Sequence, residues 1–303
     1  MKEISVIIPA YNEEKNIPVL IQKFKEFLEK NPLNLEVIIV DDGSTDKTYE
    51  IAKNLEKEVN FLKVIKHRAN MGKTEAILTG FEKAEGKYIV IMDADLQYLP
   101  ESITKLYSKI KEGFDIVTGW KRGKYEKKFV SSVYNWLSRK LFNLPIHDQN
   151  AIKILKREIL ENIFLRKDWH RYIVALACEQ GYKAGEVEVE LHPRLYGESK
   201  YRGFKRVIIG LLDLIAVKFQ TSFMKKPMLL FGSFGGALTL AGILVAIYAF
   251  YMRFVKGIGY RPLLYLVMLL IIVGIVLFVM GFLAEAISGL AERVDRLERR
   301  LTK

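Results

Sequence analysis

Apolar residues in the first 120 positions follow two alternating patterns. Short runs such as ISVIIPAY and LEVIIVDDGS are apolar at consecutive positions, whereas the longer segments between them carry apolar residues at helical spacing. Strands that are apolar on both faces and alternate with helices are typical of a parallel sheet covered by helices on both sides. The pattern therefore predicts an α/β domain built on a mostly parallel sheet.

Polar clusters follow three of the predicted strands: PAYNEE, DDGSTD and DADLQ. Ligands of such sheets bind at the carboxyl ends of the strands. Asp93, Asp95 and Gln97 offer the oxygen ligands that Mg²⁺ or Mn²⁺ prefers, and these ions are usually shared with substrate phosphates. An isolated Asp-x-Asp is more often a solvated turn, but here the Gly43 turn lets the backbone approach a ligand and Asp42 can accept from a base N–H. Together the three clusters predict a nucleotide-diphosphate site.

Two apolar segments of 25 residues each occupy positions 228–252 and 263–287, and Glu285 is their only charged residue. A bilayer core needs roughly 20 apolar residues per helical span. The alternative, a pair of buried core helices, is disfavoured because such helices rarely lack polar residues for so long. We predict a two-helix transmembrane hairpin within 227–287 and a location in the cell membrane, with two spans.

The regions around the hairpin complete the predicted organisation. Residues 1–203 form the α/β domain, and residues 204–226 combine apolar and basic residues at helical spacing, which suits an amphipathic helix in the membrane interface or an ordinary surface helix. Residues 288–303 are expected to form a cytosolic C-terminal helix. Its apolar stripe, which begins at Ile287, has heptad-like spacing and would either pair subunits in a homo-oligomer or dock on the domain.

The net charge and the predicted membrane topology restrict the kinds of partner. Three basic residues lie in the loop between the spans and eight on the outer flanks, so the flanks and the α/β domain are expected on the cytosolic side. Met1 to Ala10 is strand-like and is not expected to act as a signal peptide. The formal net charge of +12 would suggest nucleic acid in a soluble protein. Beside two spans, we expect the lipid bilayer and phosphorylated ligands as partners, and no nucleic acid.

Seven motifs then carry a resemblance to a known family: SVIIPAYNEEKNI, VIIVDDGSTDKT, HRANMGKTEAILTGFEKAEGKYIVIMDADLQ, VTGWKR, HDQNAIKILKRE, WHRYIVALA and HPRLYGESKY. In this order, over about residues 3–220, they resemble glycosyltransferase family 2, in its branch of dolichyl-phosphate mannose synthases and polyprenyl-phosphate glycosyltransferases. The resemblance implies a GT-A fold, which is Rossmann-like. It also implies an inverting, metal-dependent transfer of a hexose to a polyprenyl or dolichyl phosphate, with GDP-mannose as the first donor candidate and UDP-glucose or another UDP-sugar as the alternative.

The resemblance also assigns roles to residues that match the motifs of the family. Asp93, Asp95 and Gln97 match the metal motif, and Asp95, Lys121, Arg194 and Lys200 are the expected catalytic residues. Lys121 stands where the family usually has arginine and Lys153 where many members have it, so both keep the charge but lose the bidentate fork. The predicted nucleotide-sugar site consists of Pro9, Ala10, Tyr11, Glu13, Val40, Asp42, Asp93, Ala94, Asp95, Gln97, Lys121, Arg194 and Lys200.

The acceptor phosphate needs cations of its own near the membrane. The basic segment WKRGKYEKKFVSS offers Lys121, Lys127, Lys128, Ser131 and Ser132, although it could also be a basic surface loop. His170 and Arg171 fit either a functional role or a supporting role in the core, and the sequence does not decide between them.

Three alternative functions have recognisable marks. A processive polysaccharide synthase would carry a Q-x-x-R-W motif, which is absent from the sequence. A non-catalytic membrane scaffold with a nucleotide-sugar fold would have degraded metal and diphosphate residues, yet these are intact. A nucleic-acid binder would bind in a strongly salt-dependent way and ignore nucleotide sugars.

Overall fold

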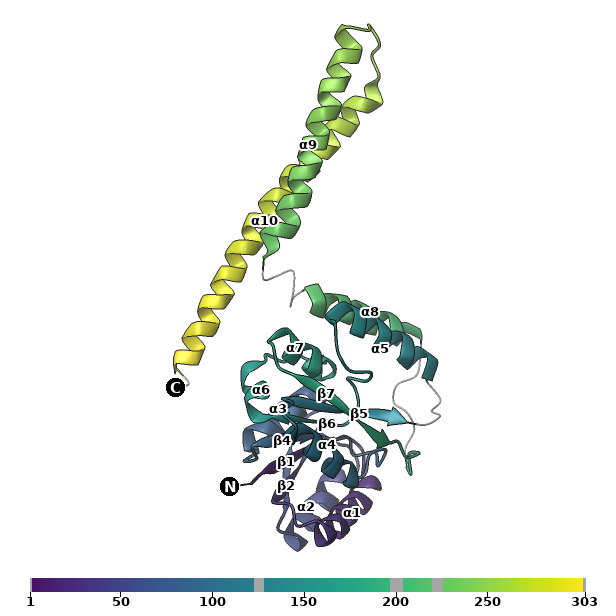
Figure 1. Ribbon diagram of the computed structural model, residues 1–303, viewed down its shortest axis with the longest axis vertical. Helices are drawn as coiled ribbons and strands as arrows, with labels where there is room; N and C mark the ends of the chain where they lie inside the picture. Colours follow the sequence, from purple (N-terminus) through teal and green to yellow (C-terminus); the bar gives the residue numbers. More distant parts are fainter. Residues whose placement is uncertain (1, 123–127, 197–203, 220–225, 302–303) are drawn as a thin grey trace. The chain divides into compact units, whose positions relative to one another are not determined.

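The computed structural model describes residues 2–122, 128–196, 204–219 and 226–301 (Figure 1). The chain divides into two units, residues 1–211 and 212–303. The elements of the chain are β1 (Ile4–Ala10), α1 (Asn16–Lys30), β2 (Leu35–Asp41), α2 (Thr48–Glu58), β3 (Leu62–Lys66), α3 (Lys73–Lys83), β4 (Tyr88–Ile91), α4 (Glu101–Lys111), β5 (Ile116–Arg122), α5 (Lys128–Phe142), β6 (Lys153–Lys156), α6 (Arg157–Asn162), the 3₁₀ helix η1 (Trp169–Tyr172), α7 (Ile173–Glu179), β7 (Ala184–Glu190), α8 (Phe204–Lys218), α9 (Pro227–Phe254) and α10 (Arg261–Leu301).

The first unit is built on a seven-stranded sheet with the order β3-β2-β1-β4-β6-β5-β7. Every pairing is parallel except those of β6, which runs antiparallel to both β4 and β5. Because of this reversal, Lys153 at the start of β6 lies opposite Ile91 at the end of β4. The mostly parallel sheet that the sequence predicts is confirmed, with one reversed strand inside it.

Both faces of the sheet are buried because successive side chains of each strand point to opposite sides. Val6 and Ile8 of β1 belong to one apolar cluster with Phe24 of α1 and Leu106 of α4. Ile7 points to the other face, where a Cβ atom added to Gly80 of α3 would lie 2.6 Å from the Ile7 side chain. Strands buried on both sides account for the continuous apolar runs of the sequence.

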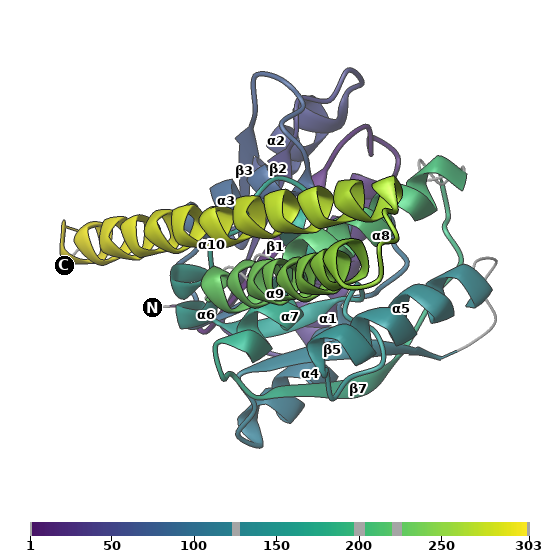
Figure 2. The same cartoon turned by 90° about the horizontal axis from the view of Figure 1, so that it is seen from above.

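The second unit is dominated by a hairpin of α9 and α10, which run side by side in both views (Figures 1 and 2). Each helix is long and apolar enough to cross a membrane, and only 17% and 6% of their most apolar windows is buried. Such exposure is opposite to that of core helices of a soluble domain. The helices approach closely at glycines: a Cβ atom on Gly235 would lie 2.6 Å from the carbonyl oxygen of Gly274.

The compact units and the predicted regions are defined differently. The two units meet after residue 211, inside α8, and the predicted bounds of the domain at residue 203 and of the interface region at 204–226 stay predictions. α10 continues without interruption to Leu301, so the predicted C-terminal helix from residue 288 is the continuation of the second apolar helix. α8 itself exposes Leu212 and Ile215 and buries Leu214, as a two-faced helix does; its place in a membrane interface stays a prediction.

Candidate active site

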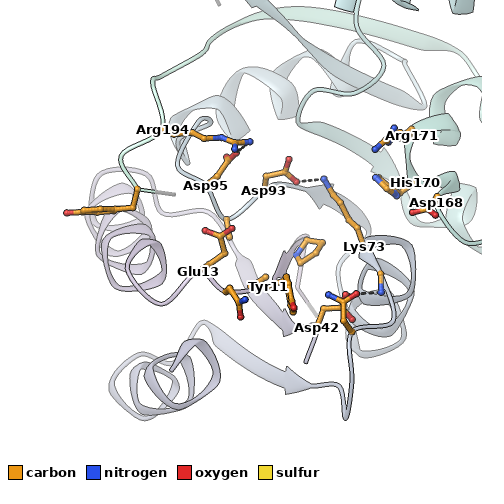
Figure 3. A pocket seen from close by; sticks show the side chains of 17 residues that line it. Tyr11, Glu13, Asp42, Lys73, Asp93, Asp95, Asp168, His170, Arg171 and Arg194 are labelled. Carbon is orange, nitrogen blue, oxygen red and sulfur yellow. Dashed lines mark hydrogen bonds and ion pairs between the residues drawn. The ribbon is translucent and has the colours of Figure 1, made fainter. Parts of the chain in front are cut away.

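A pocket opens at the carboxyl ends of β1, β2 and β4, where the polar clusters of the sequence meet (Figure 3). The structure brings many of the predicted residues together there. Those that line the pocket are Pro9, Ala10, Tyr11, Glu13, Asp42, Asp93, Ala94, Asp95 and Arg194. Side chains that the sequence left open or unassigned also line it, among them Asn12, Lys73, Asp168, His170, Arg171 and Tyr196.

Hydrogen bonds tie the loop after β1 to the loop after β2. Asn12 has a positive φ of 55°, and its backbone N–H donates to the Ser44 hydroxyl at 2.9 Å. In return, the Asn12 side-chain oxygen accepts the backbone N–H of Thr45 at 2.9 Å. The backbone N–H of Glu13 donates to Thr48 at the start of α2 at 2.8 Å. These bonds hold the two loops against each other, and the loop after β1 carries Tyr11 and Glu13.

The Asp42 carboxylate holds a third segment, residues 67–72, against these two loops. It accepts the backbone N–H groups of Met71 and Gly72, both at 2.9 Å, and lies 2.8 Å from the ring Nδ1 of His67. Both carboxylate oxygens of Asp42 already accept hydrogen bonds from the protein backbone. A nucleotide base would therefore compete with these backbone N–H groups for Asp42. The consequence is structural: segment 67–72 is clamped at the rim of the pocket.

Asp93 and Asp95 follow β4 and project into the pocket from its end (Figure 3). Arg194 forms an ion pair with Asp95 at 2.9 Å, and Lys73 forms one with Asp93. Burial and the neighbouring negative charge of Asp93 raise the pKa of Asp95 to about 6, against the opposing pull of Arg194. Burial also acts to raise the pKa of Asp93, but the adjacent Lys73 outweighs it and holds that pKa below its ordinary value.

Lys73 is the missed pocket residue that forms an ion pair with a predicted metal ligand, Asp93. It begins α3, directly after the clamped Gly72, and the next residue, Thr74, lies 3.0 Å from Nδ1 of the buried His170. Burial, helped by the positive charge of Lys73, lowers the pKa of His170 well below its ordinary value, so the ring is neutral at pH 7. The strand-end rule could have found Lys73, because the segment RANMGK follows β3 at the same edge of the sheet.

The model of a family described as glycosyl transferase family 2 matches residues 5–171, more than half of the 303 residues. The chain belongs to glycosyltransferase family 2. Among its relatives, a dodecaprenyl-phosphate galacturonate synthase of Rhizobium johnstonii is 31% identical, over 97% of this chain and 90% of the relative. An undecaprenyl-phosphate 4-deoxy-4-formamido-L-arabinose transferase of Photorhabdus laumondii is 29% identical, over 95% and 89%. These relatives put the chain in the polyprenyl-phosphate branch of family 2.

Solved structures show the same fold. Glucosyl-3-phosphoglycerate synthase from Mycobacterium tuberculosis, in a complex with Mn²⁺, UDP-glucose and phosphoglyceric acid, aligns with a TM-score of 0.55 and 19% identity, over 73% of this chain and 79% of that chain. A complex of the same enzyme with Mg²⁺ and UDP aligns with a TM-score of 0.53 and 20% identity, over 70% and 79%. The family and the GT-A-like fold predicted from the sequence are both confirmed.

The carboxylates of this family 2 pocket fit a divalent cation. Asp93 and Asp95 are hard oxygen donors on one short segment, and each is ion-paired through one of its two oxygens. Among the residues that the structure describes, no group of three His, Cys, Asp or Glu side chains could hold a metal by itself. Mg²⁺ typically binds through one or two carboxylates together with substrate phosphates. Asp93 and Asp95 would therefore hold the ion together with a phosphorylated ligand.

Other predicted residues lie away from the pocket lining. Val40 is fully buried in β2. Gln97 donates its backbone N–H to Asp95 at 3.2 Å, but its side chain does not line the pocket. Lys121, also absent from the lining, forms an ion pair at 3.2 Å with the buried Asp148. Lys153 lies buried near both, and burial lowers its pKa to about 8.

The remaining predicted residues cannot be placed by their side chains. Lys127 and Lys200 lie outside the residues that the structure describes. Lys128, Ser131 and Ser132 lie in the first half of α5, and their side chains are likewise outside the described part. Their roles in binding the diphosphate or the acceptor phosphate stay predictions.

Proposed function

We propose that this glycosyltransferase transfers a sugar, with inversion, from a nucleotide-sugar donor to a polyprenyl phosphate. The observation that carries the proposal is the arrangement of Asp93, Asp95, Lys73 and Arg194 around one pocket. Two carboxylates for a cation and two basic side chains for phosphates are what a nucleotide diphosphate requires. The polyprenyl acceptor is supported by the named relatives, whose similarity extends over nearly the whole chain, hairpin included.

The chemistry needs stabilisation of the leaving group above all. Breaking the sugar–phosphate bond leaves a nucleoside diphosphate with one more negative charge, and Arg194 can meet it with a forked pair of donors. A divalent ion held by Asp93 and Asp95 would supply further charge neutralisation. Tyr11 and Glu13 line the same pocket and would bind the nucleoside part of the donor.

The acceptor brings its own nucleophile. A lipid monophosphate is mostly dianionic near neutral pH because its second pKa is about 6, so attack on the sugar needs no strong general base. His170 is neutral and buried, and its ring nitrogen is engaged with Thr74, which suits a supporting role. In this proposal Lys121 binds the acceptor phosphate together with the predicted residues Lys127, Lys128, Ser131 and Ser132. The buried Lys153 adds its positive charge nearby.

The donor divides the proposal into two versions. Resemblance of the motifs favours GDP-mannose, whereas the sugars in the names of the relatives are galacturonate and 4-deoxy-4-formamido-L-arabinose. Because none of these is mannose, we favour the alternative donor class, a UDP-linked sugar, over GDP-mannose. The Asp42 carboxylate already accepts the backbone N–H groups of Met71 and Gly72, so it gives no ground for choosing between the bases.

The membrane hairpin fits the acceptor. A polyprenyl phosphate presents its phosphate at the bilayer surface, and α9 and α10 would anchor the pocket to that surface. The bias of basic residues toward the outer flanks of the hairpin favours the cytosolic side for the first unit.

A transfer assay tests the proposal. The full chain in detergent is given Mn²⁺, a polyprenyl phosphate and one radiolabelled donor per reaction from a panel that includes GDP-mannose, UDP-glucose and UDP-galacturonate. We expect label in the lipid phase from one donor and at least about 100-fold less from the Asp95→Asn variant. If no donor labels the lipid and no nucleotide raises the melting temperature, the proposal fails for these donors and the alternative of a non-catalytic membrane scaffold is favoured.

A further inference from the structure

Both carboxylates of the metal motif are already ion-paired within the protein. Lys73 pairs with Asp93 and Arg194 with Asp95, and the two cations come from opposite sides of the pocket (Figure 3). The four groups together carry no net charge when all are ionised. A divalent cation alone would add two positive charges to this set, and a donor diphosphate alone would add two negative charges. Only the two ligands together preserve the balance.

The surroundings of Lys73 fix its backbone, while its ion pair with Asp93 is accessible from the pocket. The N–H of the preceding Gly72 donates to Asp42 at 2.9 Å, and the following Thr74 is bonded to buried His170. The Lys73 side chain is 28% exposed and Asp93 is 41% exposed, so their ion pair faces the open pocket. A lysine ammonium on a flexible four-carbon stem can change partners at little cost in such a setting.

We infer that Lys73 is an exchangeable counter-ion: it neutralises Asp93 in the free protein and moves onto the diphosphate of the donor when a divalent cation occupies that carboxylate. Arg194 makes the corresponding exchange from Asp95. The inference rests on the proposed function, because it takes a nucleotide diphosphate and a divalent cation as ligands. It adds that the protein binds these two ligands cooperatively and that Lys73 is a source of the coupling.

The consequence is a specific pattern of affinities. While Lys73 holds Asp93, a cation must displace it, so Mn²⁺ binds weakly to the free protein. A diphosphate that receives Lys73 releases Asp93 for the cation. Binding of one ligand therefore strengthens binding of the other by the same factor, and coupling of this kind typically amounts to about 5-fold to 150-fold.

The test is a titration of the full chain in detergent with Mn²⁺, in which the signal of unbound Mn²⁺ is read by electron paramagnetic resonance. Titrations are made without nucleotide and with saturating UDP or GDP. For the wild type we expect at least about 10-fold tighter Mn²⁺ binding with one of the nucleotides. For Lys73→Met we expect tighter Mn²⁺ binding than in the wild type without nucleotide, and a coupling factor several-fold smaller than in the wild type, with the remainder supplied by Arg194.

Three further variants complete the test. Lys73→Arg keeps the charge and should keep the coupling. Lys73→Gln removes the charge and should reduce the coupling. It takes the place of Lys73→Met if that variant does not fold. Lys167→Met removes an exposed lysine beside Gly72 that has no part in the Asp93 ion pair, and it should behave as the wild type.

Two outcomes would overturn the inference, and they are distinguishable. If the wild type shows coupling and the Lys73→Met and Lys73→Gln variants show the same coupling factor, Lys73 is not an exchanging group, whereas sugar transfer by the wild type is unaffected. If the wild type binds neither Mn²⁺ nor a nucleotide, the proposed function fails together with the inference.

Discussion

The carboxylate of Asp42 accepts the backbone N–H of Gly72, 30 residues further along the chain, at a distance of 2.9 Å. This bond links the loop after β2 to the start of α3, and it sets the position of Lys73 at the rim of the pocket. Gly43, next to Asp42, completes the junction. It has a φ of +68°, and a Cβ atom there would lie 2.7 Å from the backbone nitrogen of Asn70.

Gly43→Ala should therefore disrupt the pocket as well as the fold. An alanine at this φ costs about 1–2 kcal/mol from backbone strain alone, and the clash with segment 69–70 adds to that cost. Gly113→Ala is the matched control, because Gly113 has a φ of +100° but no atom within 4 Å of its added Cβ. Thermal unfolding and nucleotide binding check both variants: only Gly43→Ala should weaken nucleotide binding, and equal losses of stability would contradict the account.

Arg194 should contribute more through its geometry than through its charge. Removing a donor that stabilises the leaving group typically costs about 100-fold to 1,000-fold in rate, so Arg194→Met should lower kcat/KM by that order. Arg194→Lys keeps the charge and loses the fork, and it should recover only part of the loss. Steady-state kinetics with the identified donor makes the comparison. Full activity of Arg194→Met would show that Arg194 does not stabilise the leaving group.

Lys153 should make stability depend on pH. Burial lowers its pKa to about 8, so between pH 8 and its ordinary pKa near 10.5 the unfolded chain binds more protons than the folded one, and stability rises with pH in that window. Below pH 8 the buried charge costs on the order of 3 kcal/mol. Lys153→Met should therefore be more stable than the wild type at pH 7, with an advantage that fades toward pH 10.5.

The control for this prediction is Lys156→Met in the same strand. The ion pair of Lys156 with Asp115 raises the pKa of Lys156 instead of lowering it, so no gain at pH 7 is expected. Chemical denaturation at a series of pH values measures both variants. The proposal for the acceptor phosphate also requires that Lys153→Met bind polyprenyl phosphate more weakly despite its greater stability.

The stability of the hairpin should depend on the close approach of Gly235 and Gly274. Gly235→Leu would force a side chain against Gly274 and Phe278, whereas an added Cβ at the adjacent Gly236 meets no atom within 4 Å. Hydrogen exchange in detergent reports each helix separately. We expect faster exchange in α9 and α10 for Gly235→Leu and little change for Gly236→Leu. Equal behaviour of the two variants would mean that the close approach of the helices does not stabilise the hairpin.

Much of this architecture is predictable because it follows from local pattern. Continuous apolar runs indicate the parallel sheet, and the rule that ligands bind at strand ends is enough to bring Asp42, Asp93 and Asp95 to one edge of it. The length and composition of α9 and α10 indicate the hairpin in the same way.

What escaped prediction depends on contacts between distant segments. The reversal of β6 places Lys153 beside the end of β4, and no local pattern distinguishes a parallel from an antiparallel buried strand of four residues. The contact of Lys121 with Asp148 and the burial of His170 beside Thr74 are likewise products of the tertiary fold. Lys73 was within reach of sequence reasoning, but its ion pair with Asp93 was not.

The central claim is that the phosphate of a lipid attacks the donor sugar held in this pocket. The most direct measurement is the mass of the product formed by the full chain from its identified donor when it is offered a polyprenyl phosphate, the corresponding polyprenol and 3-phosphoglycerate in separate reactions. The account predicts a glycosylated polyprenyl phosphate in the first reaction and no product in the other two. Glycosylation of the polyprenol or of the soluble phosphate in preference to the polyprenyl phosphate would contradict it.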